Sequence, residues 1–109
     1  MIVSRYIWNP LLINGLKFDL RIYVLLTSIL PLRIYIYEEG LARFATEKYF
    51  VGQPFQTSKY MHLTNYSVNK FSKNFVQNFD PLKDDVGNKW SLTALKKFFL
   101  ENVITFSNL

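Results

Sequence analysis

The stretch "KFDLRIY" (residues 17–23) opens a run apolar enough for a buried strand, yet every second residue in it is charged. In an extended chain, successive side chains point to opposite faces of a sheet. Lys17, Asp19 and Arg21 therefore share one face, and apolar residues share the other. The charged face either meets solvent or forms a polar floor for an anion, with Lys and Arg as donors and Asp as an acceptor. Spacing alone leaves both interpretations open.

Composition favours a folded domain. The chain has 109 residues, of which 50% are hydrophobic and 17% aromatic, which is too rich in core formers for a disordered segment. It has no cysteine and one histidine, so a disulfide scaffold and a zinc module are both excluded.

The charge balance favours an anionic partner. Thirteen Lys and Arg against eight Asp and Glu leave a net charge of +5, which suits nucleotides, nucleic acids, anionic membranes or acidic peptides. The longest apolar stretch, residues 22–32, is interrupted by Thr27, Ser28 and Pro31 and is shorter than the roughly 20 residues of a membrane span. No signal peptide is recognisable at the N-terminus. We therefore expect a soluble protein without a membrane partner.

The first half of the sequence predicts a β meander. Residues 2–7 predict a short strand, and "WNPLLING" (residues 8–15) predicts a connection. Residues 17–28 predict the main strand, "SILP" a turn, and residues 33–37 its antiparallel partner. "EEG" (residues 38–40) predicts a further turn before a third strand over residues 41–46.

The second half predicts a loop and then a helix. Residues 50–60 lack a clear period and predict a surface loop, and Asn65 is a candidate cap for a short helix. From Ser91, a natural N-cap, the sequence predicts a helix of about three turns. Its apolar stripe comprises Leu92, Leu95, Phe98, Phe99 and then Asn102 or Val103. No internal domain boundary is apparent.

Two single residues have competing interpretations. His62 in "MHLTN" is better explained as a satisfied, half-buried histidine than as a metal ligand, because no second histidine exists. Arg43 lies inside an apolar strand, where an unpaired charge is costly, so it requires a carboxylate or an anionic ligand.

Three segments in register carry a resemblance to a known family. They are "RYIWNPLLINGLKFDLRIYVLLTS", "PLRIYIYEEGLARFATEKY" and "MHLTNYSVNK". Together they resemble the central part of the tubulin tyrosine ligase-like family, and most of all its polyglutamylases, over roughly residues 3–104. Each motif alone is weak evidence, whereas their common order and spacing are specific.

The resemblance implies an α+β, ATP-grasp-like fold that is mainly an antiparallel sheet with a C-terminal helix. It also implies a ligase reaction: ATP phosphorylates a protein carboxylate, and the amine of an amino acid then displaces phosphate. Such a site must neutralise phosphate charge and hold the free amino acid by its carboxylates. For a polyglutamylase, glutamate is joined to glutamate side chains of tubulin tails.

The resemblance also assigns site residues. The ATP-binding positions are Ser4, Arg5, Tyr6, Ile7, Lys17, Phe18, Asp19, Thr64 and Asn65. In the first segment the family commonly has Gln where this chain has Ser4, so the backbone of Tyr6 and Ile7 is expected to meet adenine. Arg21 and Arg43 are the expected catalytic residues. The amino-acid substrate is expected to meet Arg43, Tyr66, Ser67 and Lys89.

The same matching implies what lies elsewhere. The family's phosphate-binding lysines precede these motifs and its magnesium ligands follow them, so residues 1–109 are expected to form one part of the domain. Mg²⁺ is therefore expected as a cofactor together with ATP, but no metal ligand is expected in this chain, and the chain alone is expected to be inactive.

The expected partners are free glutamate and the acidic C-terminal tails of tubulin or microtubules. The expected location is the cytoplasm and cytoskeleton, including cilia, axonemes of flagella and basal bodies. Two readings of the ligase stay open beside this one: a tubulin glycylase or tyrosine ligase relative, and a non-catalytic remnant or interaction module. A basic nucleic-acid-binding β module, suggested by the aromatics of "RIYIY" and "KYF", is disfavoured because those aromatics alternate as core residues do.

Overall fold

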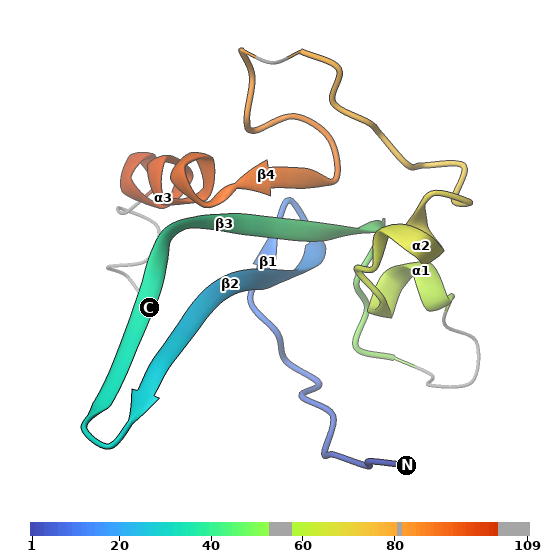
Figure 1. Cartoon of the computed structure of the whole chain (residues 1–109). Coiled ribbons are helices and arrows are strands. Elements are labelled where there is room, and N and C mark those ends of the chain that lie inside the picture. The colour runs from blue at the N-terminus through green and yellow to red at the C-terminus, as the bar shows by residue number, and fades with distance from the viewer. Residues whose placement is uncertain (53–57, 81, 103–109) are drawn as a thin grey trace. The chain divides into compact units, whose positions relative to one another are not determined.

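The computed structural model describes residues 1–52, 58–80 and 82–102. The chain divides into two compact units, the first made of Met1–Phe18 and Phe44–Phe75 and the second of Asp19–Arg43 and Val76–Leu109. The described strands form one antiparallel sheet in the order β1-β2-β3-β4 (Figure 1). This sheet, followed by a C-terminal helix, confirms the predicted α+β class.

A tight turn starts the sheet in the first unit. Strand β1 (Leu12–Ile13) pairs with the start of β2 through Ile13 opposite Leu16. Asn14 and Gly15 join them with φ of 53° and 75°, which is the backbone that Asn-Gly favours in a two-residue hairpin. The predicted connection over residues 8–15 was therefore wrong at its end, since it contains a short strand.

A long hairpin follows. Strand β2 (Leu16–Ile29) and strand β3 (Leu32–Lys48) are joined at Leu30 and Pro31, which confirms the predicted main strand, turn and partner. The turn predicted at "EEG" and the separate strand over residues 41–46 were wrong, because β3 runs through both.

Gly40 lets β3 run through "EEG" close to the backbone of β2. A Cβ atom there would lie 2.5 Å from the carbonyl oxygen of Arg21. A glycine inside a strand often marks such a close approach of another backbone, so here the residue signals packing and not a turn.

The strand predicted over residues 2–7 was also wrong. Residues 1–7, all of which the structure describes, lie outside any strand. Ile2 and Val3 are 97% and 82% exposed, so they have no sheet face to pack against. Only Tyr6 of this segment is half-buried, and it is held by its side chain.

The core of the first unit lies under the end of β3. Its buried apolar residues are Ile13, Phe44, Ala45, Tyr49 and Met61. The short helices α1 (Lys59–His62) and α2 (Tyr66–Asn69) complete it. The predicted loop over residues 50–60 was wrong at Lys59 and Tyr60, which begin α1, and residues 53–57 lie outside the described residues. Asn65 is the N-cap residue of α2, without a side-chain cap hydrogen bond.

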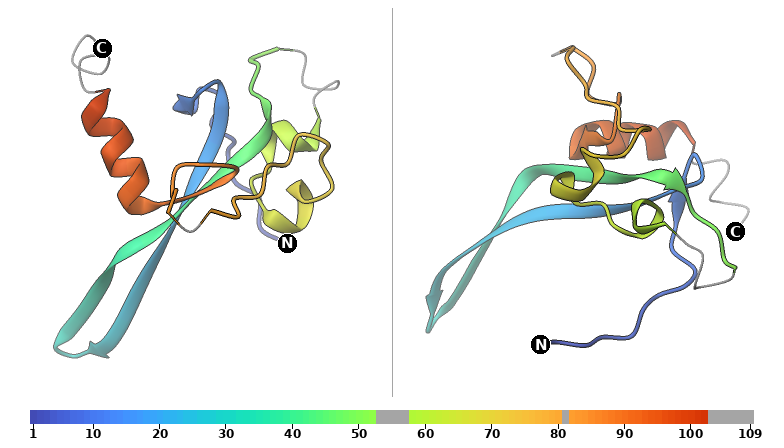
Figure 2. Two further views of the ribbon diagram at one scale, coloured as in Figure 1. Left: turned by 90° about the horizontal axis from the view of Figure 1, so that it is seen from above. Right: turned by 90° about the vertical axis from the view of Figure 1, so that its right-hand side faces the viewer.

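The core of the second unit lies between β3 and its C-terminal elements. Strand β4 (Lys89–Ser91) leads directly into helix α3 (Leu92–Glu101), seen along two further directions in Figure 2. The Ser91 hydroxyl accepts a hydrogen bond from the Ala94 amide at 3.0 Å, which confirms the predicted cap. The buried residues are Ala42, Trp90, Ala94 and Leu95, and the Trp90 ring lies 5.7 Å from that of Phe98. Val103 of the predicted stripe lies outside the described residues.

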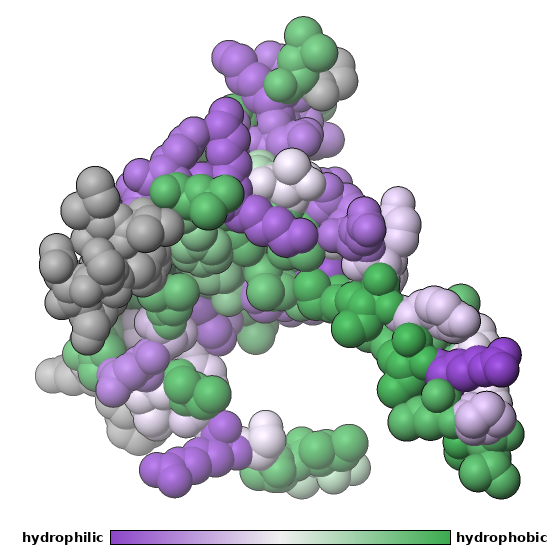
Figure 3. Space-filling view, turned by 90° about the vertical axis from the view of Figure 1, so that its left-hand side faces the viewer, coloured by the Kyte–Doolittle hydropathy of each residue, from purple (hydrophilic) through white to green (hydrophobic). Residues whose placement is uncertain are grey.

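The outer part of the hairpin has no such cover. We call residues 20–37 the arm, and Figure 3 shows it at the right as a largely hydrophobic surface. Among its residues, Leu25 is 61% and Ile36 67% exposed. Among the described residues, no helix is long and apolar enough to cross a membrane.

Candidate functional site

Lys17 anchors the first group of predicted site residues, which lies in the first unit. Its Nζ donates to the Tyr6 hydroxyl at 3.3 Å and to the backbone carbonyl of His62 at 3.0 Å. It also lies 4.9 Å from the centre of the Tyr6 ring, within the range of a cation–π contact. An ammonium group has three N–H donors, and the hydrogen bonds of the described residues occupy two of them.

His62 is a satisfied histidine, as the sequence predicted. The Tyr6 hydroxyl and the His62 Nδ1 are 2.7 Å apart, and the Tyr6 and Tyr49 rings both meet the imidazole edge to face. The Tyr49 hydroxyl donates to the backbone carbonyl of Trp8 at 2.9 Å, and burial raises the pKa of that phenol. Residues 6–8 are therefore held by Tyr49, directly after β3, and by His62 of α1, a contact that the sequence pattern does not predict.

The Thr64–Asn65 loop is held from inside by Asn69. The Asn69 amide donates to the carbonyls of Leu63 at 2.7 Å and Asn65 at 3.1 Å, and its oxygen accepts from the Thr46 hydroxyl at 2.8 Å. Asn69 is 1% exposed. Sequence reasoning missed this residue, although an asparagine four positions after Asn65 in a short helix was an available signal.

The remaining predicted residues of the first unit have open or partly open surroundings. Ser4, Arg5 and Ile7 are exposed on the segment before β1. Phe18 stacks on Phe44 with ring centres 5.5 Å apart. Tyr66 and Ser67 are exposed on α2, where the Tyr66 ring lies 5.7 Å from that of Phe75.

Asp19 and Arg43 form the second group, in the second unit. The Arg43 Nε donates to Asp19 Oδ1 at 2.9 Å, and its Nη2 donates to Asp19 Oδ2 at 2.5 Å. Hydrogen bonding to Asp19 raises the pKa of Arg43. The side chains are 21% and 39% exposed for Arg43 and Asp19, respectively. This confirms one of the two alternatives for Arg43, a carboxylate partner, and it leaves the outer edge of the guanidinium fork facing away from Asp19.

Lys89 is brought to Arg43 by strand pairing. In the β3–β4 register, Arg43 is the direct partner of Lys89. Residues directly opposite on antiparallel strands have their Cβ atoms about 4.5–5.5 Å apart on one face, and like charges there are destabilising. Arg43 and Lys89 with Asp19 thus leave one net positive charge at the strand pair itself, while Asp80 and Asp84 line a cavity beside Lys89. The arrangement suits an anion with more than one acceptor oxygen.

Two further features surround these groups in the second unit. Lys89 lines a cavity of about 350 Å³ together with Asp80 and Asp84 of the loop before β4, Leu41 of β3, and Trp90 and Ser91 of β4. Arg21, the third charge of the opening motif, is exposed on β2. The structure therefore places Arg43 opposite Lys89 and leaves Arg21 on the exposed part of β2.

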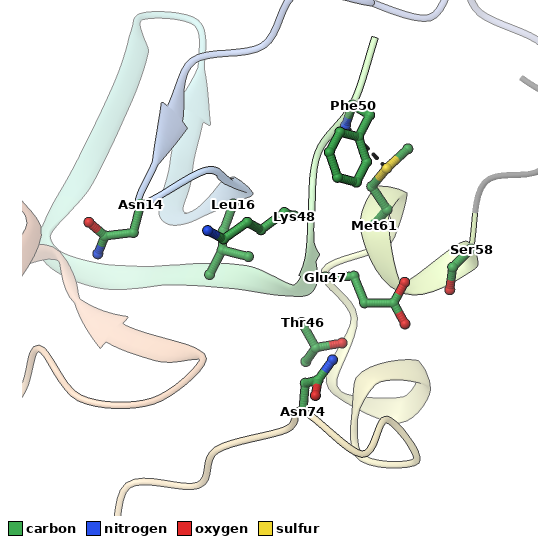
Figure 4. Close-up of a pocket in the computed structure, with 9 residues that line it drawn as sticks. All are labelled: Asn14, Leu16, Thr46, Glu47, Lys48, Phe50, Ser58, Met61 and Asn74. Atoms are coloured by element: carbon green, nitrogen blue, oxygen red, sulfur yellow. Dashed lines mark hydrogen bonds between the residues drawn. The ribbon is translucent and has the colours of Figure 1, made fainter. Parts of the chain in front are cut away.

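A separate cavity of about 580 Å³ lies in the first unit (Figure 4). Its lining comes from the β1–β2 turn, the end of β3 and α1, with Lys48 beside Leu16, and Phe50 beside Met61. The described residues that line it include none of the predicted site residues. Sequence reasoning did not anticipate it.

The described residues do not fit a resident metal ion. Among residues 1–52, 58–80 and 82–102, no group of three His, Cys, Asp or Glu side chains could hold one. Asp19, the carboxylate among the predicted site residues, is already paired with Arg43.

The class of protein follows from comparison with family models. The chain matches the model described as the tubulin-tyrosine ligase family over residues 1–107. It therefore belongs to the tubulin-tyrosine ligase family, and its antiparallel sheet and C-terminal helix agree with part of an ATP-grasp-like domain.

Individual relatives narrow this further. The chain is 57% identical over 98 residues to the tubulin polyglutamylase TTLL5 of Mus musculus, covering 90% of this chain and 7% of that protein. It is 48% identical over 99 residues to tubulin polyglutamylase ttll-5 of Caenorhabditis elegans, with 90% and 14% covered. It is 47% identical over 104 residues to tubulin monoglutamylase TTLL4 of Mus musculus, with 95% and 9% covered. The chain thus spans at most about a seventh of the length of these relatives.

Proposed function

We propose that this chain contributes the nucleotide and amino-acid contacts of an ATP-dependent ligase that joins glutamate to glutamate side chains of tubulin tails. The names of the relatives support glutamate as the added amino acid, since they are a monoglutamylase and polyglutamylases. Tubulin as the acceptor rests on the same names.

The observation that carries the proposal is the placement of Arg43 opposite Lys89. A free glutamate has two carboxylates, and its amine must stay uncharged and unobstructed to attack. Binding it by its carboxylates through two cations leaves the amine free. Asp19 holds the Arg43 fork through Nε and Nη2, so the guanidinium keeps one orientation while its remaining donors face the substrate. Tyr66 and Ser67 are proposed as further contacts to the same amino acid.

The nucleotide contacts are proposed for the first unit. Lys17 has a donor left for a phosphate oxygen, and the backbone of residues 4–7 is open to a base. Thr64 and Asn65 stand on a loop fixed by Asn69, which suits hydroxyl and amide contacts to a nucleotide. ATP, when bound, supplies the phosphoryl group that activates the acceptor carboxylate. Phe18 and Asp19 are proposed as further contacts to ATP, and Arg21 as a catalytic residue. Mg²⁺ is proposed for the complete enzyme, with ligands other than the described residues.

The acceptor and the location follow from the same reasoning. A net charge of +5 favours approach of acidic tubulin tails, because complementary charge raises association rates. We place the activity in the cytoplasm at microtubules, including those of cilia, axonemes and basal bodies.

The test is a chimera. The matched 98 residues of the mouse relative TTLL5 are replaced by this chain, and glutamate added to tubulin is measured by mass spectrometry with ATP. Arg43→Ala is expected to abolish incorporation while binding of an ATP analogue persists, and Lys17→Ala is expected to weaken nucleotide binding itself. Arg33→Ala, which removes the same charge from the exposed arm, serves as the matched control.

Three outcomes would redirect the proposal. If Arg43→Ala leaves incorporation unchanged, the amino-acid assignment is wrong even though the family stands. Glycine or tyrosine incorporated in place of glutamate would favour the related ligases. A folded chimera that neither binds ATP nor modifies tubulin would favour a non-catalytic module.

A further inference from the structure

Glu39 in the middle of β3 binds the start of helix α3. Its Oε1 accepts hydrogen bonds from the backbone amides of Leu92 at 2.8 Å and Thr93 at 3.2 Å, and its Oε2 accepts from the Thr93 hydroxyl at 2.6 Å. The Gly40 amide donates to Oε1 as well, at 2.9 Å. The first amides of a helix have no partner inside it. A carboxylate from another strand therefore supplies what a capping residue supplies locally.

This contact lies next to the residues of β3 and β4 whose pairing sets the proposed site. Strand β4 has three residues, which pair Leu41 with Ser91, Ala42 with Trp90 and Arg43 with Lys89. Because side chains alternate along a strand, a slip of one residue would send Lys89 to the opposite face. Three pairs give few ladder hydrogen bonds to resist such a slip, so β4 needs a second anchor.

Glu39 is that anchor, because it lies on β3 and binds the first residues of α3. It lies four residues before Arg43 on β3, and Leu92 lies three residues after Lys89 on the neighbouring segment. Leu92 also packs beside Gly40, with its side chain 3.6 Å from where a Cβ would lie, an ordinary van der Waals distance. Fixing Leu92 against Glu39 therefore fixes which residue of β4 stands opposite Arg43.

We propose that Glu39 is a positioning residue for the amino-acid pocket, acting through the start of α3 to hold Lys89 opposite Arg43. This inference rests on the function proposed above, because it takes Arg43 and Lys89 to be the amino-acid contacts. Glu39 touches neither side chain, and its four hydrogen bonds all go to residues 40, 92 and 93. Its role is to place another residue.

The test uses the chimera described above and measures KM for glutamate and KM for ATP separately. Glu39→Gln keeps one acceptor oxygen, but it removes the negative charge and the hydrogen bonds that the second oxygen accepts. It is expected to raise KM for glutamate about tenfold, the equivalent of about 1.4 kcal/mol, with KM for ATP unchanged. Glu38→Gln changes the neighbouring, exposed glutamate in the same way and is expected to change neither value.

A double-mutant cycle then tests the route. If Glu39 acts through Lys89, Glu39→Gln adds little to the effect of Lys89→Ala, because interacting sites are not additive. A full additional effect in the Lys89→Ala background would overturn the inference, as would an equal rise in KM for ATP. Should Glu39→Gln prevent folding, as a thermal melt would show, Thr93→Val removes only the hydroxyl contact. It is then expected to raise KM for glutamate to a lesser degree, and no rise would overturn the inference.

The two levels of proposal fail in different ways. Unchanged incorporation in Arg43→Ala together with an unchanged KM for glutamate in Lys89→Ala contradicts the proposed amino-acid site. Lost incorporation in Arg43→Ala and a raised KM in Lys89→Ala, with no change in Glu39→Gln, contradict only the positioning role.

Discussion

The two halves of strand β3 share one extended backbone and have opposite surroundings. In the arm, Tyr35 is 58% and Tyr37 66% exposed, whereas Ala42 and Ala45 are completely buried further along the same strand. Strand β4 pairs only with residues 41–43 of β3, and β1 only with Leu16 and Lys17 of β2. In the described part of the chain, neither strand reaches the arm.

The difference lies in residue size and in what the rest of the chain brings. The buried half uses Gly40, Ala42 and Ala45, which let other elements come close, and then fills the gaps with larger residues such as Phe44. The arm places large apolar residues on both faces of a two-stranded hairpin. Such a hairpin is at best marginally stable in water unless something covers it. Alternation therefore predicts a strand, but it does not tell which part of the strand is covered.

The largest expected effect contrasts the same truncation at a covered and an uncovered leucine. Leu95 in α3 is 2% exposed. Leu95→Ala should lower the free energy of unfolding by about 2–5 kcal/mol, because the change leaves a cavity. Leu25→Ala in the arm, 61% exposed, should cost under about 0.5 kcal/mol. Urea denaturation followed by tryptophan fluorescence measures both. Equal losses would mean that the arm is packed as tightly as the core.

The next effect tests the close approach at Gly40. Gly40→Ala places a methyl group 2.5 Å from the Arg21 carbonyl oxygen, and relieving this overlap by a backbone shift should cost about 1–3 kcal/mol. Gly52→Ala is the matched control, since a Cβ there meets nothing within 4 Å. A Gly40→Ala variant as stable as the Gly52→Ala variant in the same urea titration would contradict the packing described here.

A third prediction concerns the arm directly. The isolated 109-residue chain should self-associate through its exposed apolar faces, as sedimentation velocity would show. The pair Leu25→Lys and Ile34→Lys should shift it towards monomer, because both positions are more than half exposed and added charges oppose association. The pair Lys96→Leu and Lys97→Leu on α3 is a control for a general charge effect, and it should not reduce association.

The smallest expected effect is a pH dependence at the covered end. The hydrogen bond from Thr93, followed by that from Gly40, lowers the pKa of Glu39. A carboxylate with a lowered folded-state pKa adds stability above its unfolded value, about 4.3, and that stability is lost as the pH falls through the folded value. Melting temperatures between pH 7 and pH 3 should therefore converge for the wild type and Glu39→Gln at the acidic end. Glu38→Gln should run parallel to the wild type, and a constant gap for Glu39→Gln would contradict the assignment.

Much of the fold could be predicted from local signals. The hairpin of residues 17–37 was predictable from alternation, and α3 from its cap at Ser91 and its apolar stripe. Strand β1 was missed although its signal is local, since Asn14-Gly15 favours a two-residue hairpin. The run of β3 through "EEG" could not be predicted, because a Glu-Glu-Gly sequence by itself favours a turn and the Glu39 contact with α3 joins residues distant in sequence.

The site was predictable in a different way. The motifs supplied the candidate site residues, which stay a prediction, and the cost of burying a lone charge predicted a carboxylate or an anionic ligand beside Arg43. That the carboxylate is Asp19, and that Lys89 stands opposite Arg43, required the strand register. The motifs gave no role to Asn69 or Glu39, since each is defined by the backbone groups it meets, and they did not predict the side-chain contact between Tyr6 and His62. The assignment of residues 1–109 to one part of a larger domain stays a prediction.

The anchoring of β4 from its C-terminal side has a consequence for the connection before it. The ends of that connection meet where the Val76 amide donates to the Asn88 side chain at 2.8 Å and the Asn88 amide donates back to the Val76 carbonyl at 3.1 Å. Lengthening a surface loop between closed ends costs little, on the order of 0.6 kcal/mol for each doubling. An insertion between residues 77 and 87 can therefore change the rim of the proposed amino-acid pocket, and with it the acceptor proteins that fit. Lys89 would still lie opposite Arg43.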